Sequence, residues 1–152
     1  MRLSDLKNAH ALEDVWLVGS DSSLGYFPDG FWAGRTVIGV NKVPLTVPSR
    51  YCITKFDWGL DWLRGHADGL PDTLVVTSKH QMGFYSHPVA EGMPGNVVTF
   101  DHLDNPVQQF NPAQHIPDDG RLLVSFSTLG SGMHLAAWMG ARTVFMVGVS
   151  GG

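Results

Sequence analysis

Two short polar turns contain the residues best suited to bind a ligand. Residues 19–23, Gly-Ser-Asp-Ser-Ser, follow the apolar run 15–18, and residues 127–132, Ser-Thr-Leu-Gly-Ser-Gly, follow the apolar run 122–126. Asn41 ends a third apolar run. Hydroxyls, backbone N–H groups and an amide at strand ends suit the phosphate, ribose or base of a nucleotide better than acid–base chemistry. The alternative for the first turn is a solvent-exposed hinge, and the alternative for the second is a tight turn that only caps a helix.

The second turn contains the predicted anion-binding residues Gly130, Ser131 and Gly132. A helix of small residues is expected directly after it, over 133–139, and its positive amino end would favour a phosphate. His134 falls in the first turn of that predicted helix and is the histidine best placed to face a ligand. An outward position on the helix surface is the alternative for His134.

The remaining patterns argue against several enzyme classes. The seven histidines form no HExxH pair, and no Cys–His group has zinc spacing. No Walker phosphate-binding motif occurs, the first turn is not GxGxxG, and Ser131 does not lie in GxSxG. Residues 101–104, Asp-His-Leu-Asp, are a weak metal pattern. No pair of carboxylates suits acid–base catalysis, so neither a catalytic residue nor a metal ligand is assigned.

Composition indicates one globular domain over residues 1–152. The chain is 43% hydrophobic and 16% charged, with a net charge of −4 and no basic run, which disfavours a nucleic-acid or anionic-membrane partner. The amino-terminal segment contains no apolar stretch long enough for a signal peptide or a membrane span. Cys52, the single cysteine, excludes an internal disulfide, fits the cytoplasm and is expected in the core.

These turns require a sheet that brings strand ends together. Strands alternating with short helices predict an α/β fold, a Rossmann-like three-layer sandwich with a mostly parallel sheet of about 6–7 strands. Residues 79–94 and 104–120 are expected to be irregular, the second as a long loop. A short helix over 1–13 would place Leu3, Leu6 and Leu12 on one side. A second helix is expected over 57–67, capped by Asp57. The predicted strands are 15–18, 35–40, 50–56, 73–77, 97–100, 122–126 and 143–149.

Three blocks of the sequence carry a resemblance to known families. They are VWLVGSDSSL at 15–24, VIGVN at 37–41 and SGMHLAAWMGARTVFMVGV at 131–149. In this order they resemble the φφφφGxGPSL opening, the following strand that ends in Asn, and the SGxxAaxxAxxLGaxxIxLxGxD block of two related groups. These groups are the bacterial lipooligosaccharide-type sialyltransferases and the MptE-like domains, named for a 6-hydroxymethyl-dihydropterin diphosphokinase.

The resemblance implies a Rossmann-like domain that holds a nucleotide, a CMP-sugar in the transferases or ATP in the kinase. The residues it places around the nucleotide, from the phosphates to the base or ribose, are Gly19, Ser20, Ser22, Ser23, Asn41, Ser131, Gly132, Gly148 and Ser150. Asp21 stands where the family has Gly, Ser22 where it has Pro, and Ser150 where it has Asp. A carboxylate at Asp21 would repel a phosphate unless it is turned away or joined by a cation. The chain stops at Gly152, before the transferases' general base, so we expect a fragment or a nucleotide-binding core.

The leading hypothesis is a nucleotide-sugar-dependent glycosyltransferase-like domain of sialyltransferase type. It would act by direct displacement at the sugar, with residues 130–132 and the helix end stabilising the leaving phosphate. Ser131→Asp is then expected to abolish nucleotide binding and leave the fold intact. One alternative is a pterin diphosphokinase that uses ATP and Mg²⁺, with Asp21 helping to hold the metal. The other is a non-catalytic nucleotide-binding domain or fragment. The acceptor, sugar, base and oligomeric state are not predicted.

Overall fold

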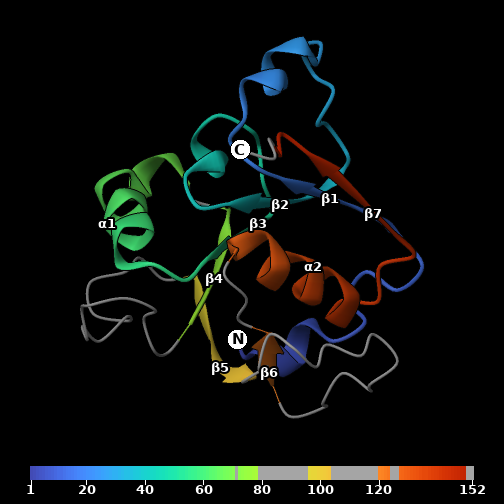
Figure 1. Ribbon diagram of the computed structural model, residues 1–152, viewed down its shortest axis with the longest axis vertical. Helices are drawn as coiled ribbons and strands as arrows, with labels where there is room; N and C mark the ends of the chain where they lie inside the picture. The colour runs from blue at the N-terminus through green and yellow to red at the C-terminus, as the bar shows by residue number, and fades with distance from the viewer. Residues whose placement is uncertain (71, 79–95, 104–119, 124–126, 150–152) are drawn as a thin grey trace.

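The computed structural model describes residues 1–70, 72–78, 96–103, 120–123 and 127–149. Seven strands form one sheet in which every pairing is parallel, in the order β6-β5-β4-β3-β2-β1-β7 (Figure 1). This confirms the predicted α/β fold with a parallel sheet. The strands are β1 (Asp14–Val18), β2 (Thr36–Val40), β3 (Tyr51–Thr54), β4 (Leu74–Ser78), β5 (Val97–Leu103), β6 (Arg121–Leu123) and β7 (Thr143–Val147).

The two α-helices cover opposite faces of the sheet (Figure 1). Helix α2 (Thr128–Trp138) packs through Leu135 on the face that contains Ile53. Helix α1 (Asp57–Gly65) packs through Leu60 on the face that contains Cys52. Because successive side chains of a strand point to opposite faces, these contacts define a three-layer sandwich. Four short 3₁₀ helices complete the described elements: η1 (Leu3–Leu6), η2 (Ser22–Tyr26), η3 (Val43–Leu45) and η4 (Ala67–Gly69).

Helix α2 begins earlier than the sequence predicts. It starts at Thr128, so the predicted turn at residues 130–132 lies inside the helix. The Ser127 hydroxyl accepts a hydrogen bond from the backbone N–H of Leu129 and caps the helix. The glycine at 132 serves packing, since an added Cβ there would come within 2.6 Å of Leu17 Cδ1. The predicted turn before Met133 is therefore wrong as a description of the backbone, and anion binding by these residues stays a prediction.

The predicted helix over residues 1–13 is also wrong. Only η1 forms, Leu3 and Leu6 are buried, and Leu12 is 76% exposed with a φ of 64°. The backbone N–H groups of Asn8, His10 and Leu12 donate to carbonyls of Trp138, Met139 and Gly140 at the end of α2. Helix ends leave carbonyl groups without partners inside the helix. The amino-terminal segment supplies those partners instead of continuing its own helix.

Other boundaries shift by a few residues. Strand β3 ends at Thr54, β5 extends to Leu103, and β7 ends at Val147. Phe56 rather than Asp57 precedes α1 as its N-cap residue. Residues 79–94, 104–119 and 124–126 lie outside the described residues, as does the predicted site residue Ser150. Within the part of the chain that the structure describes, no helix is long and apolar enough to cross a membrane.

Candidate functional site

A cavity of about 380 Å³ lies at the carboxyl edge of the sheet, where the ends of β1, β2 and β7 meet the amino end of α2. Parallel strands end at the same edge, so turns from distant parts of the sequence converge there. Polar groups dominate the described lining. The described residues that line the cavity are Gly19, Ser20, Asp21, Ser22, Val40, Asn41, Ser127, Thr128, Leu129, Gly148 and Val149.

Gly19 and Gly148 bring the ends of β1 and β7 into backbone contact. The Gly19 N–H donates to Val147 O at 2.8 Å, and the Asp21 N–H donates to Gly148 O at 3.0 Å. A Cβ on Gly148 would come within 2.5 Å of Gly19 O, and a Cβ on Gly19 within 2.5 Å of Gly148 O. Gly148 also has a φ of 67°, which side-chain-bearing residues rarely adopt. No side chain fits between the two backbones, so glycine is needed at both positions. The two glycines form the floor of the cavity.

The Asp21 carboxylate is turned toward its own backbone. Its Oδ1 accepts a hydrogen bond from the Ser23 N–H at 2.8 Å, and Asp21 is the N-cap residue of η2. Aspartate is a preferred residue at this position because its side chain satisfies an amide that the helix leaves unpaired. The capping bond gives Asp21 a structural role at the rim of the cavity, beside the exposed hydroxyl residues Ser20 and Ser22.

The amino end of α2 forms the opposite wall. Ser127 Oγ accepts from the Leu129 N–H at 3.1 Å, and Ser127 O accepts from the Gly130 N–H at 3.1 Å. Thr128 is 5% exposed and Leu129 is half-buried. The first turn of a helix carries partial positive charge, so this wall favours an anionic group in the cavity.

Asn41 stands at the end of β2 in a left-handed conformation with a φ of 54°. Its backbone N–H donates to Ile53 O at 3.0 Å, and its side-chain Oδ1 accepts from the Thr54 hydroxyl at 3.0 Å. Asparagine tolerates this backbone conformation better than most residues. The neighbouring strand β3 thus holds both the backbone and the side chain of Asn41 at the cavity.

Six of the twelve predicted nucleotide-binding residues line the cavity, and five others are described elsewhere. Ser131 is fully buried within α2, and Gly132 faces Leu17 and Ile53 of the sheet. Ser23 lies behind the rim in η2, and Gly130 lies in the first turn of α2. The six that the structure brings together are Gly19, Ser20, Asp21, Ser22, Asn41 and Gly148.

His134 lies in the second turn of α2 rather than the first, because the helix begins at Thr128. The residue is partly buried, and this burial lowers the pKa of its imidazole below the ordinary 6.5. A lowered pKa keeps His134 neutral at pH 7. The side chain therefore contributes no positive charge toward an anion at that pH.

The sequence places Ser127, Thr128 and Leu129 in the second polar turn but predicts the anion-binding role for Gly130, Ser131 and Gly132, whereas the first three line the cavity. The sequence predicts a helix that starts at Met133, whereas the helix starts at Thr128 with Ser127 as its N-cap residue. The sequence feature that could have indicated the helix start is Ser127, a good N-cap residue that is followed by residues compatible with a helix.

Among the described residues, no group of three or more His, Cys, Asp or Glu is arranged to hold a metal ion.

No protein-family model and no curated protein matches this sequence. Among solved structures, the chain is similar to MAf glycosyltransferase from Magnetospirillum magneticum AMB-1, with a TM-score of 0.63 and 14% sequence identity. The similarity covers 93% of this chain and 24% of that one, so this chain spans about a quarter of that protein's length. At this identity the likeness shows a shared fold.

Proposed function

We propose that this chain is a nucleotide-sugar-dependent glycosyltransferase-like domain, of sialyltransferase type, that binds the donor nucleotide at the carboxyl edge of its sheet. The observation that carries the proposal is the polar cavity of about 380 Å³ between the turn after β1 and the amino end of α2. Open α/β sheets bind ligands at this edge. The shared fold with a solved glycosyltransferase supports the same class of activity.

The cavity suits a nucleotide phosphate on chemical grounds. The amino end of α2 favours negative charge, and the wall around Ser20 and Ser22 offers hydroxyl groups. In a transfer reaction the sugar–phosphate bond breaks as the acceptor attacks the sugar. The leaving nucleotide then gains negative charge, which the end of α2 would stabilise. We assign no general base among the described residues.

A pterin diphosphokinase-like activity is the second candidate, and the position of Asp21 at the cavity is the observation in its favour. A carboxylate oxygen is a good ligand for Mg²⁺, which accompanies ATP in such reactions. This function predicts nucleotide binding that requires Mg²⁺ and is lost in Asp21→Ala. The glycosyltransferase proposal predicts binding without metal, preferably of a cytidine nucleotide.

The first experiment is a thermal-shift titration of the chain with CMP, CDP, UDP, ATP and GTP, each with and without Mg²⁺. A ligand that binds only the folded state raises the apparent stability by RT ln(1 + [L]/Kd). We expect a metal-independent shift with CMP or CDP. A Mg²⁺-dependent shift with ATP would favour the kinase, and no shift with any of the five would overturn nucleotide binding.

A charge change at Ser127 tests the location. Ser127→Asp and Ser127→Asn both keep a good N-cap residue, so both should fold, but only the aspartate adds a negative charge to the cavity wall. Two like charges about 4 Å apart repel by roughly 1 kcal/mol in bulk water and roughly 4 kcal/mol near a protein surface. Ser127→Asp should therefore weaken nucleotide binding about tenfold or more. Ser127→Asn should stay near wild type. Equal affinities would place the phosphate elsewhere. Ser131→Asp is unsuitable, since it would put a charge into the core.

A further inference from the structure

A part-buried side-chain hydrogen bond joins the end of β3 to Asn41 at the cavity. Thr54 ends β3 and is fully buried, and its hydroxyl donates to Oδ1 of Asn41 at 3.0 Å. Asn41 lines the cavity from the end of β2. The bond turns Oδ1, the acceptor atom of the Asn41 side chain, toward Thr54. The other polar atom of the carboxamide is Nδ2, which can only donate.

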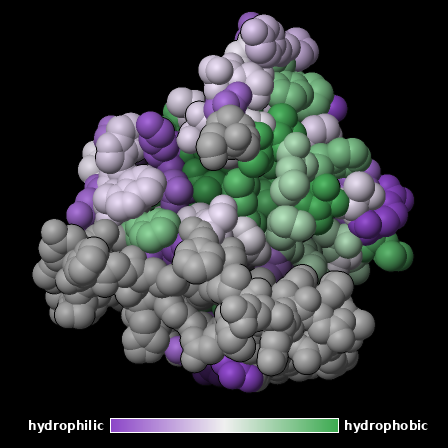
Figure 2. Space-filling model, viewed as in Figure 1, coloured by the Kyte–Doolittle hydropathy of each residue, from purple (hydrophilic) through white to green (hydrophobic). Residues whose placement is uncertain are grey.

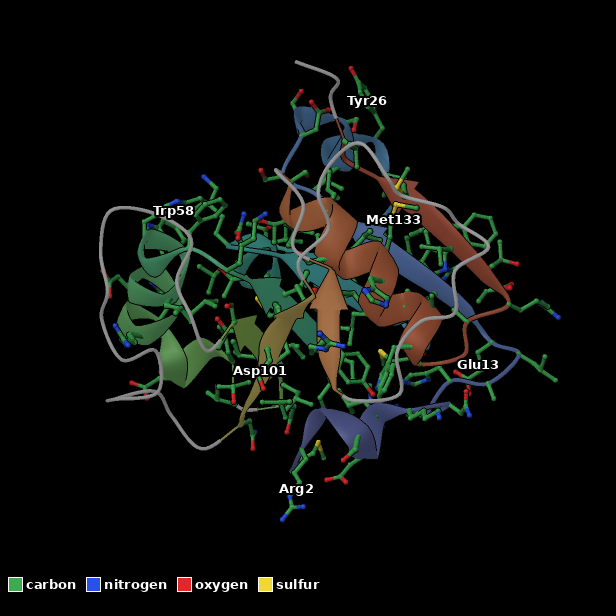
Figure 3. All side chains as sticks on the ribbon, turned by 60° about the horizontal axis from the view of Figure 1, so that its bottom comes forward. Arg2, Glu13, Tyr26, Trp58, Asp101 and Met133 are labelled. Carbon is green, nitrogen blue, oxygen red and sulfur yellow. The ribbon has the colours of Figure 1, made fainter. Side chains whose placement is uncertain are left out.

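Helix α1 is fitted around this pair by a glycine. A Cβ on Gly59 would collide with Thr54 Oγ1 and come within 3.4 Å of Asn41 Oδ1. Gly59 is buried in the first turn of α1, whereas the neighbouring Trp58 is 52% exposed and points away from the sheet (Figure 3). Glycine is less favourable than alanine inside a helix. Here it lets the helix backbone lie directly against the hydrogen-bonded pair.

The backbone of Asn41 is held as firmly as its side chain. Its N–H donates to Ile53 O, and its carbonyl oxygen accepts from Cys52 Sγ at 3.2 Å. In the part of the chain that the structure describes, Asn41 Nδ2 has no hydrogen-bond partner. Asn41 therefore presents a fixed donor at the cavity.

We propose that Thr54 is a positioning residue of the nucleotide site, and that it orients Asn41 so that Nδ2 donates to an acceptor atom of the ligand. The ligand atom is then a carbonyl oxygen, an unprotonated ring nitrogen or another oxygen that accepts a hydrogen bond. The proposal rests on the nucleotide-binding function proposed above. Thr54 itself touches no ligand and acts through Asn41.

Three variants separate positioning from folding. Thr54→Val removes the hydroxyl at nearly constant shape, Thr54→Ser keeps it, and Thr77→Val is the matched control. Thr77 is the register partner of Thr54 on β4, is fully buried, and among the described residues its hydroxyl has no hydrogen-bond partner. Loss of one hydrogen bond typically costs up to 1.5 kcal/mol, which corresponds to about tenfold in affinity.

The binding measurement uses whichever of CMP, CDP, UDP, ATP or GTP gives the largest thermal shift with the wild type. We expect Thr54→Val to weaken that nucleotide about tenfold, and Thr54→Ser and Thr77→Val to stay within about twofold. Wild-type affinity in Thr54→Val would overturn the proposal. Equal losses in Thr54→Val and Thr77→Val would also overturn it, because they would indicate a general packing effect.

A second readout does not depend on any nucleotide. The side-chain amide signals of Asn41 in a ¹⁵N-correlated NMR spectrum of the unliganded protein report the orientation of its carboxamide. Thr54→Val should shift these signals and raise their mobility, while Thr54→Ser and Thr77→Val should leave them near their wild-type positions. Unchanged signals in Thr54→Val would overturn the positioning role even if nucleotide binding is confirmed. Shifted signals without nucleotide binding by the wild type would instead contradict the proposed function.

Discussion

Gly148 shows how a single residue decides the shape of the candidate site. Its φ of 67° and its 2.5 Å clearance to Gly19 O each exclude a side chain, for different physical reasons. The first is strain within the residue, and the second is a collision with a residue from the other end of the chain. Because neither glycine has a side chain, β1 and β7 can approach closely and form the floor of the cavity.

We expect Gly148→Ala to destabilise the fold by roughly 2–5 kcal/mol, the sum of about 1–2 kcal/mol for the left-handed backbone and 1–3 kcal/mol for overpacking. Gly34→Ala is the matched control, since Gly34 has a similar φ of 71° but no atom within 4 Å of an added Cβ. Gly34→Ala should lower the free energy of unfolding only by the backbone contribution of about 1–2 kcal/mol. Urea unfolding of both variants measures the difference, and equal losses would show that the Gly19–Gly148 contact is loose.

At the same scale, the sequence located the residues that end strands better than those inside helices. Gly19 and Asn41 were predicted from their position after apolar runs, and both line the cavity. Ser131 and Gly132 were predicted from the composition of a turn, and both face the protein interior. Glycine and serine are as compatible with tight helix–sheet packing as with a turn, so composition alone does not distinguish these roles.

Helix α2 is the element on which both the core and the candidate site depend. Its amino end lines the cavity, and its buried side packs Leu135 and Ala136 on the sheet. Gly132 allows this approach, because an added Cβ would meet Leu17 Cδ1 at 2.6 Å and Ile53 Cγ2 at 3.3 Å. The helix therefore lies close to the strands whose ends it covers.

Gly132→Ala should lower the free energy of unfolding by up to about 2 kcal/mol. Overpacking costs about 1–3 kcal/mol, and the better helix propensity of alanine returns at most about 1 kcal/mol. Gly65→Ala, at the exposed end of α1 with open space around it, should be neutral or slightly stabilising. Chemical denaturation tests both. In a Leu17→Ala background the added methyl group has more room, so Gly132→Ala should destabilise the fold less than it does in the wild type. Strictly additive free-energy changes of the two substitutions would contradict the contact between Gly132 and Leu17.

For the whole molecule, the strand order places β7 at one edge of the sheet beside β1. Strands of parallel sheets are usually covered on both faces, yet Phe145 is 40% and Met146 is 53% exposed. Phe145 stacks on Trp16 of β1 with ring centroids 4.6 Å apart. Figure 2 shows hydrophobic residues gathered over α2 and the adjoining β7. The apolar sequence of β7 thus predicted a strand, but not its position at the edge.

Cys52 reports on the cooperativity of the entire sheet. It is the only cysteine, lies fully buried in β3 where it packs against α1, and burial raises the pKa of its thiol. Because the thiolate is the reactive form, a thiol reagent should label Cys52 only after the sheet opens. We expect labelling about 10³-fold slower or more than in denaturant, in line with typical folding equilibria.

The control for this labelling is Tyr26→Cys in a Cys52→Ala background, since Tyr26 is 89% exposed. Its thiol should react about as fast as a thiol in a short peptide. Stopped-flow or mass-spectrometric labelling measures both rates. Comparable rates for Cys52 and the exposed cysteine would mean that the region around β3 and α1 opens without global unfolding.

By itself, the sequence determined which segments are strands, that they form a parallel sheet, and that polar residues follow the first two strands at its carboxyl edge. Those features depend on local hydrophobic pattern and on the chain direction that crossovers impose. The tertiary structure alone decided that β7 pairs with β1 and that the amino-terminal segment satisfies the carbonyls at the end of α2. These features arise from contacts between residues far apart in the chain, and such contacts leave no local period in the sequence.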